Sequence, residues 1–306
     1  MDKKTNNIVK LHKNRVLVFP KRLYIFIVPA MTLFLIFWIF PILQLFYYSI
    51  TDFNGINYNF NFVGLKNYLT ILRDGSLINA LKNTLIYTIL MVVGNNVLGL
   101  LIAMALNSKI RGKGAFRTAS FIPNLFSAIV VGFIWSYVFM PGNGLLSSFL
   151  KILGFNGSTI DLLGNFKTAL FAIAVVEIWR GFGSAMIIYL AGLQTIDESL
   201  IEAGKIDGCT EMQLFIKIKL PLIFPIITIN IILNVINGLK AFDFPFIMTN
   251  GGPGRSTNTL MFIIYKTAFN DQMMGKASAY AVVSFFVIVL ITISLLSFMN
   301  KKEVEA

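Results

Sequence analysis

Three asparagines interrupt one of the most apolar stretches of the sequence, "ITINIILNVING". Asn230, Asn234 and Asn237 are spaced by four and three residues, so an α-helix would place their side chains within an arc of about 60°. An amide both donates and accepts hydrogen bonds, so this face could bind the hydroxyl groups of a polar solute. Hydrogen bonding between helices is the alternative. Asn95 and Asn96, in a second apolar stretch, leave the same two alternatives open.

Two pairs of opposite charges also lie within apolar stretches: Glu177 with Arg180, and Lys240 with Asp243. Each pair is spaced i, i+3, and residues at that spacing are neighbours on a helix and can neutralise one another. We therefore expect internal ion pairs close to the edge of an apolar layer. Gating of a polar path, or contact with a partner chain, are the alternatives.

The sequence offers no set of residues suited to catalysis or metal binding. It has a single cysteine, Cys209, and a single histidine, His12, so neither an internal disulfide nor a Cys/His metal cluster is expected. No nucleophile stands with a convincing base, and the glycine-rich phosphate loop of nucleotide-binding proteins is missing from the sequence. We expect a protein that is not an enzyme and binds no metal or cofactor of its own.

The composition indicates an all-α integral membrane protein. Apolar residues make up 56% of the chain, charged residues 13%, and the mean hydropathy is +0.75, whereas soluble domains carry about 25% charged residues. Trp135, Tyr137 and Trp179 could stack on a ring-shaped ligand, but near span ends we expect interface anchors. Six runs are long enough to cross a bilayer, namely Leu23–Ser49, Ala80–Asn107, Ala119–Met140, Thr168–Leu193, Leu220–Met248 and Ala277–Met299.

The net charge of +12 follows the expected topology. With six spans both termini lie on one side, and the segments on that side carry sixteen Lys and Arg against eight on the other. This asymmetry predicts cytoplasmic termini. It also accounts for the positive net charge, so no nucleic-acid-binding surface is needed to explain that charge. The expected organisation is a cytoplasmic tail over residues 1–22, a six-helix membrane domain over residues 23–299 and a second cytoplasmic tail over residues 300–306.

A polar segment separates the fourth and fifth spans, and we call residues 194–219 the elbow. Asp197 is suited to cap a first helix that runs to Asp207, and Gly208 to end it in the left-handed conformation. Thr210, with Gln213 three residues later, predicts a capping box at the start of a second helix. Helices this short need a surface to dock on. Packing against the chain's own bundle and insertion into a soluble partner both remain open on physical grounds.

The elbow carries a recognisable motif. Glu202-Ala203-Gly204, Asp207-Gly208 and the run from Ile218 through Leu220 to Pro221 resemble the "EAA…G…I-LP" loop of ABC importer permeases. Gly204 departs from that pattern, in which a second alanine is usual, and we expect it to loosen the first helix by up to about 1 kcal/mol. The resemblance implies that Glu202 offers a carboxylate to a basic group of an ATPase subunit and that Gly208 sets the bend.

The resemblance extends over most of the chain, to the carbohydrate-uptake branch of these permeases. "RTASFIPNLFSAIVVGFIWSYVF", "LAGLQTI" and "MTNGGPGRSTNTLMFIIYKTAF" are similar to sequences of that branch, and the "GGP…ST.TL" pattern in the last resembles the first of the branch's two paired permeases. It implies a type I importer permease fold in the cell membrane that works by alternating access. The implied partners are a second permease, two ATPases that use ATP and Mg, and an external solute-binding protein. The implied cargo is a carbohydrate, in particular an oligosaccharide.

Two alternative functions remain open. The same machine could import glycerol phosphate or another small polar solute. An anionic cargo would favour unpaired cations on the path, and both Arg180 and Lys240 have a carboxylate nearby in the sequence. The chain could instead be a secondary carrier that needs no ATPase, an alternative that the elbow motif disfavours.

Overall fold

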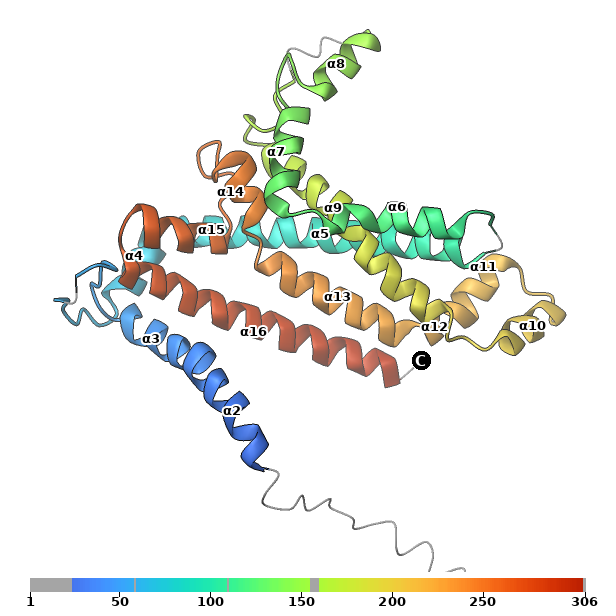
Figure 1. Cartoon of the computed structure of the whole chain (residues 1–306), viewed down its shortest axis with the longest axis horizontal. Coiled ribbons are helices and arrows are strands. Elements are labelled where there is room, and N and C mark those ends of the chain that lie inside the picture. Colours follow the sequence, from blue (N-terminus) through green and yellow to red (C-terminus); the bar gives the residue numbers. More distant parts are fainter. Residues whose placement is uncertain (1–23, 58, 109, 155–159, 305–306) are drawn as a thin grey trace, which may run out of the picture. The chain divides into compact units, whose positions relative to one another are not determined.

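The computed structural model describes residues 24–57, 59–108, 110–154 and 160–304, and helices are the only regular elements in those ranges (Figure 1). The predicted tail over residues 1–22 lies outside the described residues. The helices are α2 (Tyr24–Phe34), the π-helical η2 (Leu35–Ile39), α3 (Phe40–Ser49), α4 (Lys66–Arg73), α5 (Ser76–Asn107), α6 (Lys113–Leu125), α7 (Ala128–Val138), α8 (Leu145–Ile152), α9 (Ala169–Leu193), α10 (Glu198–Ile206), α11 (Glu211–Leu214), the π-helical η4 (Phe215–Lys219), α12 (Leu220–Leu222), α13 (Phe224–Leu239), α14 (Asp243–Thr249), α15 (Leu260–Tyr265), the π-helical η5 (Lys266–Asn270) and α16 (Met274–Val304).

The chain divides into two units, Met1–Tyr47 and Tyr48–Ala306. The first contains α2, η2 and most of α3, which together form an apolar helical segment with none of its most apolar window buried. The second unit contains every other helix and the hydrophobic core described below. Everything that bears on a functional site lies in this second unit.

Within the described ranges, four helical segments are long and apolar enough to cross a membrane: Phe26–Ser49, Ser76–Asn107, Ala169–Leu193 and Met274–Met299. They coincide with the first, second, fourth and sixth predicted spans, which are thereby confirmed as long apolar helices. The second begins at Ser76, before the predicted Ala80, and the helix of the sixth continues to Val304.

The third predicted span, Ala119–Met140, is not one straight helix. It is shared between α6 and α7, whose axes are bent by 97° at the break between them. Phe126 leaves the helical region with ψ 142°, and the Ser127 hydroxyl then caps α7 by accepting a hydrogen bond from the Ile129 amide at 3.3 Å. A serine in the middle of an apolar run has thus started a new helix.

The fifth predicted span, Leu220–Met248, is likewise wrong as a single helix. The helical segments Glu211–Leu222 and Phe224–Leu239 are bent by 69° at Ile223, and α14 begins separately at Asp243. Pro225 stands in the first turn of α13, where the missing proline N–H removes no helical hydrogen bond. If each bent pair counts as one span, the described residues contain six candidate spans, and otherwise four.

The close pairing of α5 with α9 is the central packing feature of the second unit. A Cβ atom added to Gly99 would lie 2.8 Å from the Cβ of Ala185 and 2.9 Å from the amide nitrogen of Met186. Gly94 is in similar contact with the side chain of Ile178. Small residues of this kind let two membrane helices approach until their backbones touch. Buried residues of both helices, including Tyr189, form a shared hydrophobic cluster on the side of the elbow.

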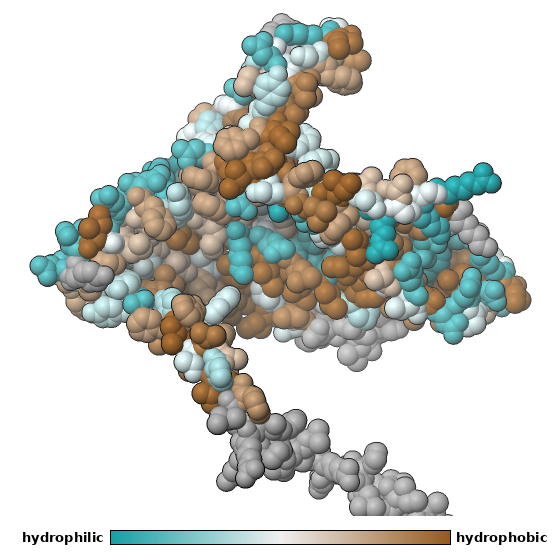
Figure 2. Space-filling model, in the orientation of Figure 1, coloured by the Kyte–Doolittle hydropathy of each residue, from teal (hydrophilic) through white to brown (hydrophobic). Residues whose placement is uncertain are grey.

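Apolar side chains cover much of the outside of the second unit, as expected for helices that face lipid. Phe133, Leu101 and Leu290 are more than half exposed. In the face shown in Figure 2, hydrophilic residues gather at the end near α4 and at the end with the elbow, and mostly apolar residues with one central hydrophilic patch lie between them. This banding is typical of a membrane-spanning bundle with polar ends.

The contact at Gly99 predicts a stability difference between two glycine substitutions. Gly99→Ala should destabilise the protein by about 1–3 kcal/mol, because the new methyl group overpacks a backbone contact. Gly114→Ala in α6 is the matched control, since nothing lies within 4 Å of a Cβ added there. It should be neutral or stabilise α6 by up to about 1 kcal/mol. Thermal unfolding in detergent measures both, and an equal change in the two variants would contradict the packing described.

Candidate functional site

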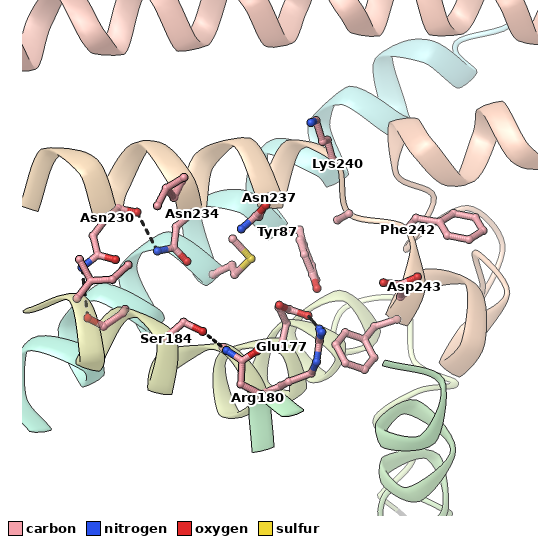
Figure 3. A pocket seen from close by; sticks show the side chains of 18 residues that line it. Tyr87, Glu177, Arg180, Ser184, Asn230, Asn234, Asn237, Lys240, Phe242 and Asp243 are labelled. Carbon is pink, nitrogen blue, oxygen red and sulfur yellow. Dashed lines mark hydrogen bonds and ion pairs between the residues drawn. The ribbon is translucent and has the colours of Figure 1, made fainter. Parts of the chain in front are cut away.

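A cavity of about 440 Å³ lies between α9 and α13, and we call it the central cavity (Figure 3). Its walls come from α5, α6, α9, α13 and the segment that leads into α14. The polar side chains that line it are those of Tyr87, Asn124, Glu177, Arg180, Ser184, Asn230, Asn234, Asn237, Lys240 and Asp243. The cavity therefore brings together residues that are up to 156 positions apart in the sequence (Tyr87 and Asp243).

The three asparagines of α13 line this cavity together, which confirms that they share one face. Asn230 also donates to the backbone oxygen of Ala185 at 3.3 Å, and Asn234 to the backbone oxygen of Asn230 at 2.9 Å. Asn237 is exposed to the cavity, and its side-chain amide makes no hydrogen bond within the described residues, while its backbone oxygen accepts from the Lys240 amide at 3.2 Å. Asn230 and Asn234 therefore contribute to helix packing, while the side-chain amide of Asn237 has no partner in the described part of the chain. Contact of this face with a solute stays a prediction.

Asn95 and Asn96 of α5 lie between helices rather than on the cavity wall. The Asn95 side-chain nitrogen donates to the Asn234 side-chain oxygen at 2.9 Å, which joins α5 to α13. Asn96 donates to the Val92 carbonyl at 2.7 Å and accepts a hydrogen bond from the Tyr189 hydroxyl. The geometry favours the packing alternative for these two, and contact with a solute stays a prediction for them.

Glu177 and Arg180 form the expected ion pair across the cavity wall, with 3.3 Å between a carboxylate oxygen and a guanidinium nitrogen. Both side chains are mostly buried, and the guanidinium also lies 5.8 Å from the ring centre of Phe244. The Nε atom of Arg180 is buried without a hydrogen-bond partner in the described part of the chain. The pair thus sets one fixed charge of each sign at the edge of the cavity.

Lys240 and Asp243 do not form the second expected ion pair. The i, i+3 argument assumed one helix, but α13 ends at Leu239 and α14 starts at Asp243, so Lys240 lies in the link after α13 and Asp243 begins the next helix. Figure 3 shows the Lys240 side chain directed away from Asp243. Within the described residues neither side chain takes part in an ion pair.

The aromatic candidates lie away from the central cavity. The rings of Trp135 and Trp179 contact each other with centres 5.4 Å apart, and Tyr137 is 54% exposed on α7. None of the three lines the cavity. Stacking on a ring-shaped ligand therefore has no support from their positions.

The elbow has the local structure that its sequence predicts. The Asp197 carboxylate caps α10 by accepting from the Ser199 amide at 3.0 Å, and this hydrogen bond holds the pKa of Asp197 below its usual value. Gly208 follows the helix with φ +79°. Thr210 and Gln213 form the reciprocal capping box of α11. Local interactions therefore determine the bend of the elbow, namely two helix caps and one glycine.

The expectation for Gly204 is corrected by the structure, because this glycine does more than loosen α10. It is buried where α10 meets the second half of the elbow, and a Cβ atom there would lie 2.7 Å from both Ile218 and Leu214 side chains. Glycine therefore makes room for two large apolar residues, one of which, Leu214, is almost fully buried. The expected loss of helix propensity is offset by closer packing inside the elbow.

The outer surface of the elbow remains apolar in places. Ile206 is 85% exposed, Met212 67% and Ile216 53%. Glu202 and Ala203 are exposed as well, and Glu202 forms no ion pair within the described residues. In contrast, Ile196 packs against the hydrophobic cluster of α5 and α9. One part of the elbow thus rests on the bundle, and the rest presents an unoccupied surface.

The comparisons with known proteins agree with this architecture. The family model described as "Binding-protein-dependent transport system inner membrane component" matches residues 95–301. The chain is 36% identical over 279 residues to "Multiple sugar-binding transport system permease protein MsmF" of Streptococcus mutans, covering 91% of this chain and 95% of that protein. It is 34% identical to "Probable starch degradation products transport system permease protein AmyD" of Thermoanaerobacterium thermosulfurigenes, covering 92% and 95%.

A third relative, "sn-glycerol-3-phosphate transport system permease protein UgpA" of Agrobacterium fabrum, is 31% identical and covers 93% of this chain and 97% of that protein. Among solved structures, one of a bacterial ABC transporter that imports alginate shares the fold with a TM-score of 0.80, at 21% identity over 91% of this chain and 95% of that chain. A second has the same TM-score of 0.80 and 22% identity, covers 92% and 94%, and holds an alginate pentasaccharide-bound periplasmic protein.

The contact at Gly204 predicts non-additive stability effects inside the elbow. Gly204→Ala alone should push Ile218 aside, and Ile218→Val removes the methyl group that the new Cβ meets. The double variant should therefore be more stable than the sum of the single effects by about 0.5–2 kcal/mol. Pairing Gly204→Ala with Ile216→Val, an exposed position, is the matched control and should be additive. Thermal unfolding of the three single and two double variants measures the coupling, and additive behaviour for Ile218 would refute the contact.

Proposed function

Because the chain belongs to the family of binding-protein-dependent transport system inner membrane components, we propose that it is the permease subunit of an ATP-driven ABC importer for a carbohydrate of oligosaccharide size. The observation that carries the cargo class is the central cavity, where a row of amides from α13 offers neutral donors and acceptors. Sugar hydroxyls are bound by such groups without a compensating charge. The names of the multiple-sugar and starch-product relatives support the same class.

In this proposal the chain crosses the cell membrane six times, with both termini and the elbow in the cytoplasm. Each bent pair, α6 with α7 and α11–α12 with α13, counts as one span. The 32 residues of α5 extend for about 48 Å, more than the roughly 30 Å of hydrocarbon, so its polar ends reach both surfaces. The excess of Lys and Arg in the segments on the elbow side supports this orientation.

The elbow is the proposed attachment point for an ATPase subunit. Its exposed Ile206, Met212 and Ile216 offer apolar contacts to a soluble protein, and the unpaired carboxylate of Glu202 offers a charge-assisted hydrogen bond to a basic group. ATP and Mg are used by two ATPase subunits in this scheme, and this chain binds neither. A second permease completes the membrane part, and a solute-binding protein delivers the cargo from outside.

The two cavity walls provide the mechanical link between ATP and cargo. α9 runs directly into the elbow, and the elbow runs through α12 into α13. Movement of the elbow therefore displaces two walls of the central cavity, and the break at Ile223 provides a hinge between elbow and wall. Alternating access then follows from changing the separation of α9 and α13.

Glycerol phosphate is the second candidate cargo. Lys240 lines the cavity and has no ion-pair partner within the described residues, so a cation is available to a phosphate. The similarity to the glycerol-phosphate permease UgpA supports the same candidate. Asp243, also unpaired in the described part of the chain, lines the same wall and repels an anion, and for that reason we place the neutral sugar first.

Coupling through the elbow predicts a position-specific loss of transport. Gly208→Ala should reduce both ATP-driven uptake and ATPase co-purification by about tenfold, because alanine strains the left-handed turn that sets the elbow. Gly142→Ala is the matched control: its φ is +78° against +79° for Gly208, neither has an atom within 4 Å of an added Cβ, and it lies outside the elbow. Glu202→Gln should also lose uptake, whereas Glu198→Gln, exposed on the same helix, should not.

The importer proposal fails if Gly208→Ala and Gly142→Ala behave alike. It also fails if the purified chain alone takes up sugar into liposomes without ATP, which is the behaviour of a secondary carrier.

The free amide of Asn237 predicts a cargo-specific effect. Asn237→Ala should raise the KM for uptake about tenfold, since it removes one hydrogen bond to the solute. The unfolding temperature of Asn237→Ala should stay unchanged, because the side chain that it removes makes no hydrogen bond within the described residues and the backbone hydrogen bond from Lys240 is kept. Asn234→Ala is the comparison variant and should lower uptake and stability together, because it also breaks the bond from Asn95.

Uptake of radiolabelled maltooligosaccharide, with and without excess glycerol phosphate, measures the predicted change in the KM for uptake. Unchanged uptake in Asn237→Ala would show that this side chain does not contact the transported solute. Inhibition by glycerol phosphate that disappears in Lys240→Gln would favour the second cargo.

A further inference from the structure

A second hollow, of about 380 Å³, lies at the opposite end of α5 from the elbow, and we call it the basic pocket. The first turns of α5, the segment leading into α9 and the loop after α14 form its wall. Each of these three elements contributes one cation: Lys82, Lys167 and Arg255. Among the residues that the structure describes, no acidic one lines the pocket. Three like charges around one hollow repel each other and attract an anionic group.

These three cations have no counter-ions in the described part of the chain. The ion pairs found there use Glu177, Glu211 and Asp74, each with other partners. Asp74, which lies just before α5, is paired with Lys276 at 3.1 Å. The charge of the basic pocket is therefore free to act on a ligand.

The pocket is also held in shape before any ligand arrives. The backbone oxygen of Arg255 accepts hydrogen bonds from the side chains of Asn79 at 2.8 Å and Asn83 at 2.9 Å. The hydroxyl of Ser256, which lines the pocket, is buried without a hydrogen-bond partner among the described residues. A cation on an anchored backbone, beside an unused hydroxyl, is a suitable arrangement for binding an oxyanion.

The position of the basic pocket along α5 determines which side of the membrane the pocket faces. Asn83 and Asn107 are 24 residues apart on one helix, so about 36 Å separates the pocket from the end of α5 next to the elbow. This exceeds the roughly 30 Å of a hydrocarbon core. With the elbow in the cytoplasm, the basic pocket opens to the outside.

We propose that the basic pocket receives an acidic segment of the solute-binding protein when that protein docks. The volume is near the lower limit of ligand sites, which suits one or two carboxylate side chains better than an oligosaccharide. Phe166 and Phe171 line the pocket and are 67% and 51% exposed, and aromatic residues beside arginine are typical of interface centres. The inference rests on the proposed function, since it needs a binding protein as partner.

The test titrates the solute-binding protein against the assembled importer in nanodiscs. Reversal of the three charges (Lys82→Glu, Lys167→Glu and Arg255→Glu together) should weaken docking at least about tenfold and leave basal ATP hydrolysis unchanged. Lys66→Glu on α4 is the matched control, because it is an exposed cation of a helix packed at the same end of α5 but outside the pocket. Docking by the wild type should weaken as salt approaches 1 M, where the Debye length is about 3 Å.

Several results would overturn the inference while leaving the importer intact. One is unchanged docking in the triple variant together with salt-independent docking by the wild type. Another is a defect seen only in nanodiscs with anionic lipid, which would identify a lipid headgroup site. A third is normal docking with selective loss of acidic-sugar uptake, which would identify a cargo site. If the triple glutamate variant fails to assemble, the combined substitutions Lys82→Gln, Lys167→Gln and Arg255→Gln replace it. The salt dependence of wild-type docking is then the second measurement of the inference. Absence of ATPase co-purification in the wild type would instead refute the proposed function.

Discussion

The close approach of α5 and α9 is the contact on which the other features depend. Gly99 lets the two backbones meet, and Gly181 of α9 leaves room for the side chain of Asn95. From there Asn95 reaches Asn234, so that α13 is tied to the same pair by a hydrogen bond inside an apolar layer. A polar contact of this kind has few competitors where water is excluded, which fixes the helices in register. The central cavity is the space left beside this three-helix contact.

The two ends of this helix pair serve different tasks. One end carries Lys82 and the loop around Arg255, which Asn79 and Asn83 hold on α5. The other end leads into the elbow, whose bend depends on Gly208 and on packing around Gly204. The cavity lies between them and shares its walls with both. In the proposed importer, delivery, passage and energy supply are separated along one axis, and helices connect the three sites.

Local features were predictable from the sequence, and features that depend on tertiary contact were not. The caps at Asp197 and Thr210 and the turn at Gly208 each depend on a few neighbouring residues, and the structure confirms them. The shared face of the α13 asparagines and the Glu177–Arg180 pair follow from helical periodicity alone. The breaks at Ser127 and Ile223 were missed because hydropathy records length and not direction. Lys240 and Asp243 were mispaired for that reason. The basic pocket could not be foreseen, since its cations are about 85 residues apart in sequence.

The exposed side chains of the elbow have a consequence for how the subunit exists in a cell. Ile206, Met212 and Ile216 face outward on a segment that is otherwise polar enough to lie in water. Without a partner they form an apolar surface that favours non-specific association and marks the chain for chaperones and proteases. The abundance of the subunit then follows that of the protein that covers this surface. We therefore expect surplus copies to be degraded, so that the ratio of the subunits is set after synthesis and not only by their expression levels.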